Sequence, residues 1–276
     1  MTSTTQHADN IRRAVVAMCS GPDGGHLGGS LSLVDILSCL YFDVLNIDPE
    51  DQVDPARDIL LLSKGHGAIA LYATLAERGY FPASELSNYH RPGGRLMSHP
   101  VAAVPGVELP TGSLGHGLGL GLGFALAARL IGPQRRVFVL LGDGELQEGS
   151  CWEAAAVAAA HRTDQLIAVV DRNGLQLGGS TESIVSIEPL AERWRSFGWS
   201  VLEVDGHDQA ALSSSLGTAP WTPGRPSVLI ANTNKGHGVP RLSGSTQSHY
   251  VVLSAAQQAR VQSSLEAFLS NGGALR

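Results

Sequence analysis

The sequence predicts an α/β protein with a doubly wound, mostly parallel sheet and helices on both of its faces. From residue 136 onward, short apolar runs alternate with segments of helical periodicity, which is typical of βαβ units. These runs are apolar almost throughout, as expected for strands buried on both faces. The chain shows no internal repeat, linker or block of charge, so we expect a single domain over residues 1–276.

The first third of the chain is expected to be mainly helical. A first helix has Asp9 as its candidate cap and places apolar residues on one face, namely Ile11, Ala14, Val15 and Met18. A second helix begins at Ser32, with Asp35 three residues later in a capping-box pattern. A short buried strand over 58–63 then leads through KGHG at 64–67 into another helix.

The rest of the chain alternates strictly. We predict strands over 136–141, 166–171, 199–205 and 226–232, and helices from 151 and over 189–198, 207–217 and 254–271. Ser150 and Glu153 suggest a capping box, and Gly198 a helix end. The glycine-rich run over 117–128 indicates close helix packing. Because ligands bind beyond the carboxyl ends of parallel strands, the loops after 141 and 171 are the expected site.

Composition excludes several classes of function. There are 19 Lys and Arg against 25 Asp and Glu, a net charge of −6, and no basic stripe that would suit nucleic acid. The apolar run over 117–128 is shorter than the ~20 residues that cross a bilayer. No secretory signal is visible, and the three cysteines, Cys19, Cys39 and Cys151, form no paired spacing. We therefore expect a soluble, cytoplasmic protein with reduced thiols.

Common nucleotide, hydrolase and zinc motifs are absent, since the chain holds no GxGxxG, GxxxxGK[ST], GxSxG, CxxC or HExxH. A different pairing remains. Asp143 follows one predicted strand and Asn173 follows the next, so both should lie at adjacent strand ends, in loops that we expect to face solvent. Their oxygens suit Mg²⁺ or Ca²⁺ with phosphate oxygens completing the shell, and the glycines Gly142 and Gly144 would let a diphosphate approach the backbone.

The stretch over 142–173, which opens with GDG and closes with Asn, resembles the thiamine diphosphate motif. The whole chain resembles transketolase, and most of all the N-terminal subunit of split, two-chain transketolases. The resemblance rests on SGPDGGHLGGSLSLVDIL, LLSKGHGAIALYATLAERGYFP, SHPVAAVPGVELPTGSLGHGLGLGLGFALA and GDGELQEGS, which follow in the order and spacing of the family.

This resemblance implies a set of cofactor contacts. Asp143 and Asn173 are similar to the side-chain metal ligands, and Leu175 to the residue whose backbone carbonyl supplies a third. Gly144 would donate its N–H to the diphosphate. Three further residues match positions at the other parts of the cofactor: Gly112 and Leu114, which hold the aminopyrimidine, and Glu148, which communicates across the subunit interface.

The resemblance also implies roles for four histidines. His66 resembles a histidine that touches the diphosphate, and His26 and His99 resemble those near the reactive carbon and the donor hydroxyls. His249 stands where the family has a further diphosphate and substrate histidine, although Tyr250 replaces the usual glycine after it. Two other positions depart from the family: His116 replaces a usual Gln, and Ser98 a common Gly.

The implied activity is transfer of a two-carbon ketol unit from a ketose to an aldehyde. The implied cofactors are thiamine diphosphate and Mg²⁺ or Ca²⁺. The activating glutamate lies in a pyrimidine-binding domain that this chain lacks, so we expect a C-terminal partner subunit and a heterotetramer of two plus two. Three alternatives remain: a subunit like deoxyxylulose phosphate synthase, one like the alpha subunit of a 2-oxoacid dehydrogenase, or a catalytically dead binding subunit.

Overall fold

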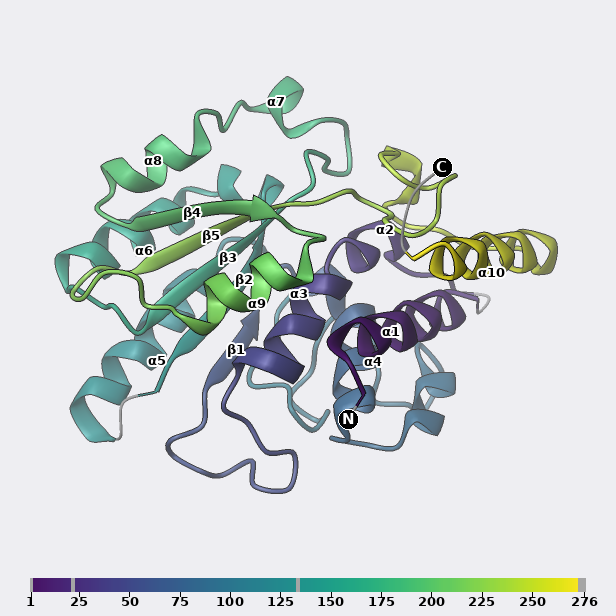
Figure 1. Cartoon of the computed structure of the whole chain (residues 1–276), viewed down its shortest axis with the longest axis horizontal. Helices are drawn as coiled ribbons and strands as arrows, with labels where there is room; N and C mark the ends of the chain where they lie inside the picture. Colours follow the sequence, from purple (N-terminus) through teal and green to yellow (C-terminus); the bar gives the residue numbers. More distant parts are fainter. Residues whose placement is uncertain (1, 21–22, 133–134, 273–276) are drawn as a thin grey trace.

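Five parallel strands form one sheet in the order β1-β2-β3-β5-β4 (Figure 1). The computed structural model describes residues 2–20, 23–132 and 135–272, without the side chain of residue 131. The strands are Ile59–Leu62 (β1), Val137–Gly142 (β2), Leu166–Arg172 (β3), Ser200–Asp205 (β4) and Ser227–Asn232 (β5). Val137 of β2 lies in register between Ile59 of β1 and Leu166 of β3. The predicted doubly wound sheet is confirmed, and only its edge strand β4 exposes alternate residues.

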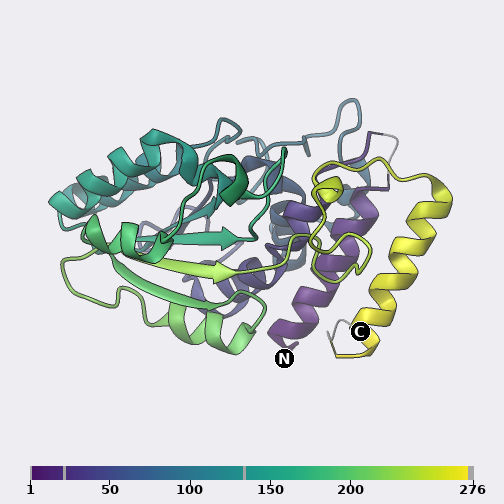
Figure 2. The same ribbon diagram turned by 90° about the horizontal axis from the view of Figure 1, so that it is seen from above.

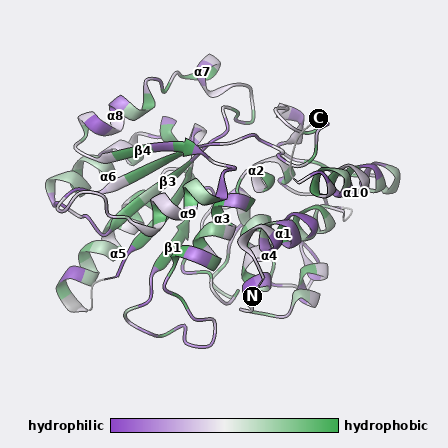
Figure 3. Cartoon of the chain, viewed as in Figure 1, coloured by the Kyte–Doolittle hydropathy of each residue, from purple (hydrophilic) through white to green (hydrophobic). Residues whose placement is uncertain are grey.

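Helices cover both faces of this sheet, and apolar residues concentrate on the strands between them (Figures 1 and 3). One core cluster packs the sheet against six helices: Thr4–Met18 (α1), Leu27–Leu31 (α2), Val34–Cys39 (α3), Ala68–Arg78 (α4), Gln209–Gly217 (α9) and Ala255–Ser270 (α10). The other face packs against Gly117–Ile131 (α5), Gly149–Ala160 (α6) and Leu190–Ser196 (α8). Short turns complete the described chain: Leu40–Val44, Gly65–Gly67, Ala83–Asn88, Gly144–Gln147, Thr181–Ile184 (α7) and Thr246–Ser248.

Two helix starts differ from the sequence prediction. Helix α1 begins before Asp9, because the side chain of Ser3 accepts the N–H of Gln6 and caps the helix there. Helix α6 begins at Gly149, and Ser150 does not cap it: its hydroxyl donates instead to the carbonyl of Gly115, at 2.8 Å. The capping box predicted at 150 and 153 was therefore wrong, since a tertiary contact takes the hydroxyl.

The apolar segment Leu27–Val44 folds as α2, α3 and the turn that follows them. By length and composition alone it could cross a membrane, and in this structure 89% of it is buried within the fold. The sequence prediction of one helix from Ser32 divides here into two short helices, one of which begins before that residue.

The glycines of α5 fall into two groups. A Cβ atom on Gly117 would lie 2.2 Å from the Ser63 hydroxyl oxygen, and one on Gly121 would lie 2.4 Å from Val139. A Cβ atom on Gly119 would only just touch a neighbour, at 4.0 Å, and one on Gly123 would meet nothing within that distance. The predicted close packing is thus confirmed for the glycines that face the sheet, whereas the other two lie on the exposed side of the helix.

Candidate functional site

A cavity of about 420 Å³ lies at the carboxyl ends of the central strands. The twelve residues singled out from the sequence come from loops spread over more than 200 positions, and the structure brings all of them to this cavity. They are His26, His66, His99, Gly112, Leu114, Gly142, Asp143, Gly144, Glu148, Asn173, Leu175 and His249. Their assigned contacts with a cofactor stay predictions.

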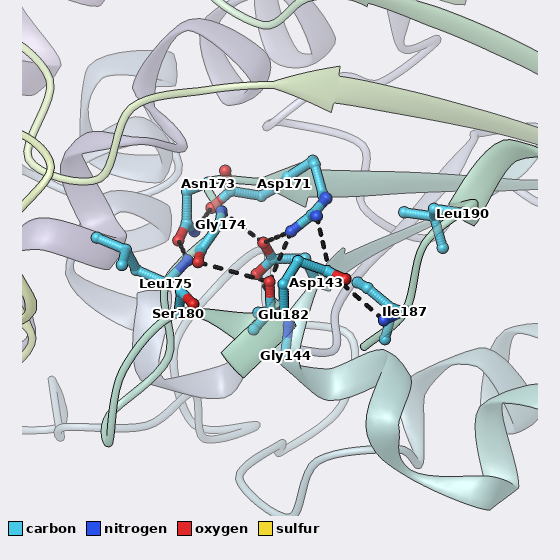
Figure 4. A network of polar contacts seen from close by, with 12 residues as sticks. Asp143, Gly144, Asp171, Asn173, Gly174, Leu175, Ser180, Glu182, Ile187 and Leu190 are labelled. Atoms are coloured by element: carbon cyan, nitrogen blue, oxygen red, sulfur yellow. Dashed lines mark hydrogen bonds and ion pairs between the residues drawn. The ribbon is translucent and has the colours of Figure 1, made fainter. Parts of the chain in front are cut away.

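Asp143 joins the loops that follow β2 and β3 (Figure 4). One carboxylate oxygen accepts the backbone N–H of Gly144 at 2.8 Å, and the other accepts that of Gly174 at 2.6 Å and a guanidinium N–H of Arg172 at 2.9 Å. The side chain is 2% exposed, so the expectation of a solvent-facing loop was wrong for Asp143. Burial, helped by nearby Asp171, raises its pKa above the usual value.

Asn173 is oriented by a buried ion pair beneath it. Its side-chain N–H donates to Asp171 at 3.1 Å, and its carbonyl oxygen accepts the N–H of Leu175, also at 3.1 Å. Asp171 is fully buried, and Lys64, 1% exposed, donates to it at 2.5 Å. Lys64 and Ser32 hold Asp171 from two other elements, so the amide of Asn173 has a fixed direction. An oxygen fixed in this way is suited to metal coordination.

The glycine before this loop leaves room for a ligand close to the backbone. A Cβ atom on Gly144 would already contact the side chain of Gln176 at 3.0 Å. Gly142 ends β2 and donates its N–H to Glu145 at 3.1 Å. Glu145 is itself buried, and it also accepts the N–H of Gly115 at 2.9 Å and the hydroxyl of Ser63. This carboxyl therefore ties together three of the loops that surround the cavity.

Four histidines cluster on the opposite wall. The ring centroid of His26 lies 5.6 Å from that of His66, 5.9 Å from that of His99 and 5.4 Å from that of His249. Burial lowers the pKa of His26 and of His249 to about 4, and it lowers that of His66 well below its usual value. These three rings are therefore neutral at pH 7 and able to accept a proton. The Nδ1 atom of His26 is buried and has no hydrogen-bond partner among the described residues.

Lys235 is a site residue that the sequence analysis missed. It belongs to the second KGHG, which we interpreted as a plain loop, yet its ammonium lies 3.0 Å from Nδ1 of His249 and 3.4 Å from the carbonyl oxygen of Leu175. Within the described part of the chain it forms no ion pair with a carboxylate, and burial together with Lys64 lowers its pKa to about 8. The repeated tetrapeptide at the end of a strand was the signal that could have identified it.

The positions that depart from the family lie at or near the rim. His116 is exposed outside the cavity and donates to the carbonyl of Leu114 at 3.0 Å. The hydroxyl of Ser98 lies 3.3 Å from Nδ1 of His99, so it can fix which nitrogen of that ring carries the proton. Tyr250 packs edge-on against His26, with ring centroids 4.9 Å apart. Among the lining residues, Gly112 and Glu148 are exposed.

The site has the chemistry that thiamine diphosphate and a divalent metal require. Carboxylate, amide and carbonyl oxygens from Asp143, Asn173 and Leu175 line one wall, and these are the ligands that Mg²⁺ prefers. A diphosphate needs positive charge and close backbone, which Lys235 and Gly144 provide. The unpartnered Nδ1 of buried His26 offers a polar group to a ligand.

Comparison with known proteins gives one consistent match. The family model for the transketolase thiamine diphosphate binding domain matches residues 3–267. One of the two subunits of an apulose-4-phosphate transketolase from Actinobacillus succinogenes is 47% identical over 247 residues, which make up 89% of each chain. A 6-deoxy-6-sulfo-D-fructose transketolase subunit from Clostridium is 42% identical over 250 residues, covering 90% of this chain and 91% of that one.

Solved structures agree with this match and show a difference in length. Transketolase from Leishmania mexicana superposes with a TM-score of 0.87 at 29% sequence identity. The matched region covers 96% of this chain but only 42% of that one. The chain therefore spans less than half the length of that single-chain enzyme, whereas it matches nearly the whole of the subunits named above.

Proposed function

Because this chain belongs to the transketolase family and corresponds to its thiamine diphosphate-binding part, we propose that it is one subunit of a two-chain transketolase. The complex would move a two-carbon ketol unit from a ketose donor to an aldehyde acceptor. The observation that carries this proposal is the single cavity in which buried Asp143 and Asn173 face Lys235 and a cluster of neutral histidines.

Three groups of this chain would hold the cofactor. Asp143, Asn173 and the carbonyl of Leu175 would bind Mg²⁺, and Lys235 and His66 would face the diphosphate. Thiamine diphosphate supplies the carbon nucleophile and the electron sink that cleavage of the donor bond needs. The protein contributes orientation: the loops that bear these groups are joined by Asp143 and Glu145, so the site is formed before any ligand enters.

The histidines would handle protons at the donor hydroxyls. Their lowered pKa values keep His26 and His249 neutral near pH 7, so each ring can take a hydroxyl proton as the donor carbon bond breaks and return it to the acceptor product. His99 lies beside His26, and its Nδ1 contacts Ser98. The side chain of Ser98 would therefore set the tautomer with which His99 meets the sugar.

The names of the relatives point to a class of substrate. One is named for apulose-4-phosphate and one for 6-deoxy-6-sulfo-D-fructose, and both compounds carry an anionic group on the sugar. We extend this to the present chain and propose that its substrates are sugars with a terminal phosphate or sulfonate. A partner subunit would supply the aminopyrimidine side of the cleft, in an assembly of two copies of each chain.

The experiment is a titration of the partner subunit. The purified chain is saturated with thiamine diphosphate, Mg²⁺, a phosphorylated ketose and an aldehyde acceptor, and the partner is added stepwise. We expect two-carbon transfer to rise to a plateau at equal stoichiometry. Rapid transfer before the partner is added would overturn the two-chain proposal. If calorimetry with the partner shows no metal-dependent heat from the cofactor, the chain is a catalytically dead subunit.

The substrate class is tested in the same assay. A neutral ketose of the same carbon skeleton is compared with the phosphorylated and sulfonated donors. We expect kcat/KM to be at least tenfold lower for the neutral donor. Equal values would overturn the proposed anionic class without affecting the transferase assignment.

A further inference from the structure

A second cavity, of about 640 Å³, lies at the amino-terminal edge of the sheet. Its walls include Asp58, Arg136 and Gln165, each of which directly precedes a strand. The strand arrowheads in Figure 2 point away from this edge, toward the candidate site. The two cavities therefore share no lining residue and open at opposite ends of the strands.

This cavity gathers positive charge in a chain whose net charge is −6. Four arginines line it, against two carboxylates, so an excess of two positive charges remains; the arginines are Arg129, Arg135, Arg136 and Arg162. Arg136 pairs with Asp58 at 2.6 Å, and Asp164 accepts the backbone N–H of Gly224. In the described part of the chain, the other three guanidinium groups form no ion pair.

Two buried polar atoms in the wall are without partners. Among the described residues, neither Nε of Arg135 nor the side-chain oxygen of Gln165 has a hydrogen-bond partner. Buried polar groups are normally satisfied, so one unpaired donor and one unpaired acceptor beside the same cavity indicate a ligand or ordered solvent. A ligand with both acceptor oxygens and a hydroxyl would satisfy the two atoms together.

The backbone of Arg162 gives an independent indication. This residue follows the end of α6 in the left-handed conformation, with φ of 50°. Helices α4 and α8 end with glycine in that conformation, Gly79 at 97° and Gly198 at 88°, as is usual because glycine adopts it without a steric cost. At the end of α6 the chain instead carries a strained arginine, and its guanidinium lies in the wall of the cavity. Local strain of this kind is typical of functional positions.

We propose that this cavity binds a small phosphate-bearing polyanion, which is a role beyond the transferase function proposed above. Its volume lies within the range of small-molecule sites. Arginine is the side chain best suited to phosphate oxygens, which it binds through two parallel N–H groups. The separation from the cofactor cavity makes the ligand an additional one that acts at a distance, and not a second substrate.

Inorganic pyrophosphate is the probe, titrated by calorimetry in EDTA so that no metal site can form. We expect binding to weaken at least tenfold in Arg162→Ala and in Arg135→Ala. Arg13→Ala removes the same charge from an exposed pair with Glu266 and should not change the affinity. Because the cofactor cavity also suits a diphosphate, Lys235→Ala is measured in parallel. Binding that is lost in Lys235→Ala and kept in Arg162→Ala would overturn the proposal, as would no binding at all.

Arg162→Gly separates the ligand site from the fold. Glycine relieves the backbone strain, so we expect this variant to melt about 2 °C higher than the parent chain while it loses pyrophosphate binding. Arg162→Ala keeps the strain and should lose binding without that gain. A lower melting temperature in Arg162→Gly, or unchanged pyrophosphate affinity, would mean that Arg162 only supports the structure.

Discussion

The carboxylate of Asp143 accepts the backbone N–H of Gly174 at 2.6 Å, and this hydrogen bond joins the loops after two neighbouring strands. The same side chain is a candidate metal ligand, so its charge serves both the loop geometry and the site. Substitutions at Asp143 are therefore expected to change stability as well as cofactor binding.

Asp143→Asn should abolish metal-dependent binding of thiamine diphosphate and lower the free energy of unfolding by about 1–3 kcal/mol. The reason is that an amide in place of the carboxylate directs an N–H group at donors, which leaves a buried donor unsatisfied. Calorimetry and urea unfolding measure the two effects. Asp48→Asn is the control, because Asp48 also accepts a backbone N–H but lies exposed and far from the site. Unchanged cofactor affinity in folded Asp143→Asn would remove the metal assignment.

Glu145→Gln should weaken cofactor binding although we assign Glu145 no direct contact with the cofactor. Its carboxyl accepts N–H groups from Gly115 and Gly142, and an amide cannot accept both through two oxygens. We expect a loss of about 2 kcal/mol in stability and a higher cofactor Kd. Glu153→Gln, on the exposed side of α6, should change neither quantity. If Glu145→Gln binds the cofactor as the parent does, the loop-joining role is wrong.

His26→Ala and His99→Ala should each lower turnover by roughly 10² to 10⁴ fold, with a smaller effect on cofactor affinity. Their rings lie together beside the part of the cavity assigned to the donor. Steady-state kinetics with the partner subunit gives kcat, and calorimetry gives the cofactor Kd. His161→Ala, an exposed histidine at the end of α6, is the control. A loss of affinity with no loss of rate would reverse the assigned roles.

The free energy of unfolding should fall as the pH is lowered from about 6.5 toward 4. Burial holds the pKa of His26 at about 4 in the folded chain, whereas the unfolded chain binds that proton near 6.5. Between these values protonation favours the unfolded state, so stability is lost as the pH decreases. His26→Gln should show a shallower pH dependence in urea unfolding. Parallel curves for the two proteins would show that His26 is not buried in its neutral form.

The sequence was sufficient for the sheet and for the site residues within its motifs. Apolar runs located the strands, and a parallel sheet brings Asp143 and Asn173 to neighbouring strand ends whatever the details of the loops. Contacts between distant segments were not predictable in this way. The bond from Ser63 to Glu145 joins residues 82 positions apart and depends on β1 lying beside β2.

Irregular segments hid the other missed features. Lys235 reaches the site because the chain after β5 folds back on itself without a regular period, so no pattern marks the direction of its side chain. Helix starts were misplaced where several residues could serve as the cap. Ser3 and Asp9 are both good caps by type, and only packing of the first turn decides between them.

The two kinds of glycine in α5 have a consequence for laboratory evolution of this chain. In a library in which every residue is varied, side chains at Gly117 and Gly121 would reduce protein abundance, because each collides with the sheet. Side chains at Gly119 and Gly123 meet almost nothing within the chain, so abundance alone would permit them. Repeating the selection for activity with the partner co-expressed would then separate the constraints: positions tolerated in the first screen and rejected in the second would trace the footprint of another subunit.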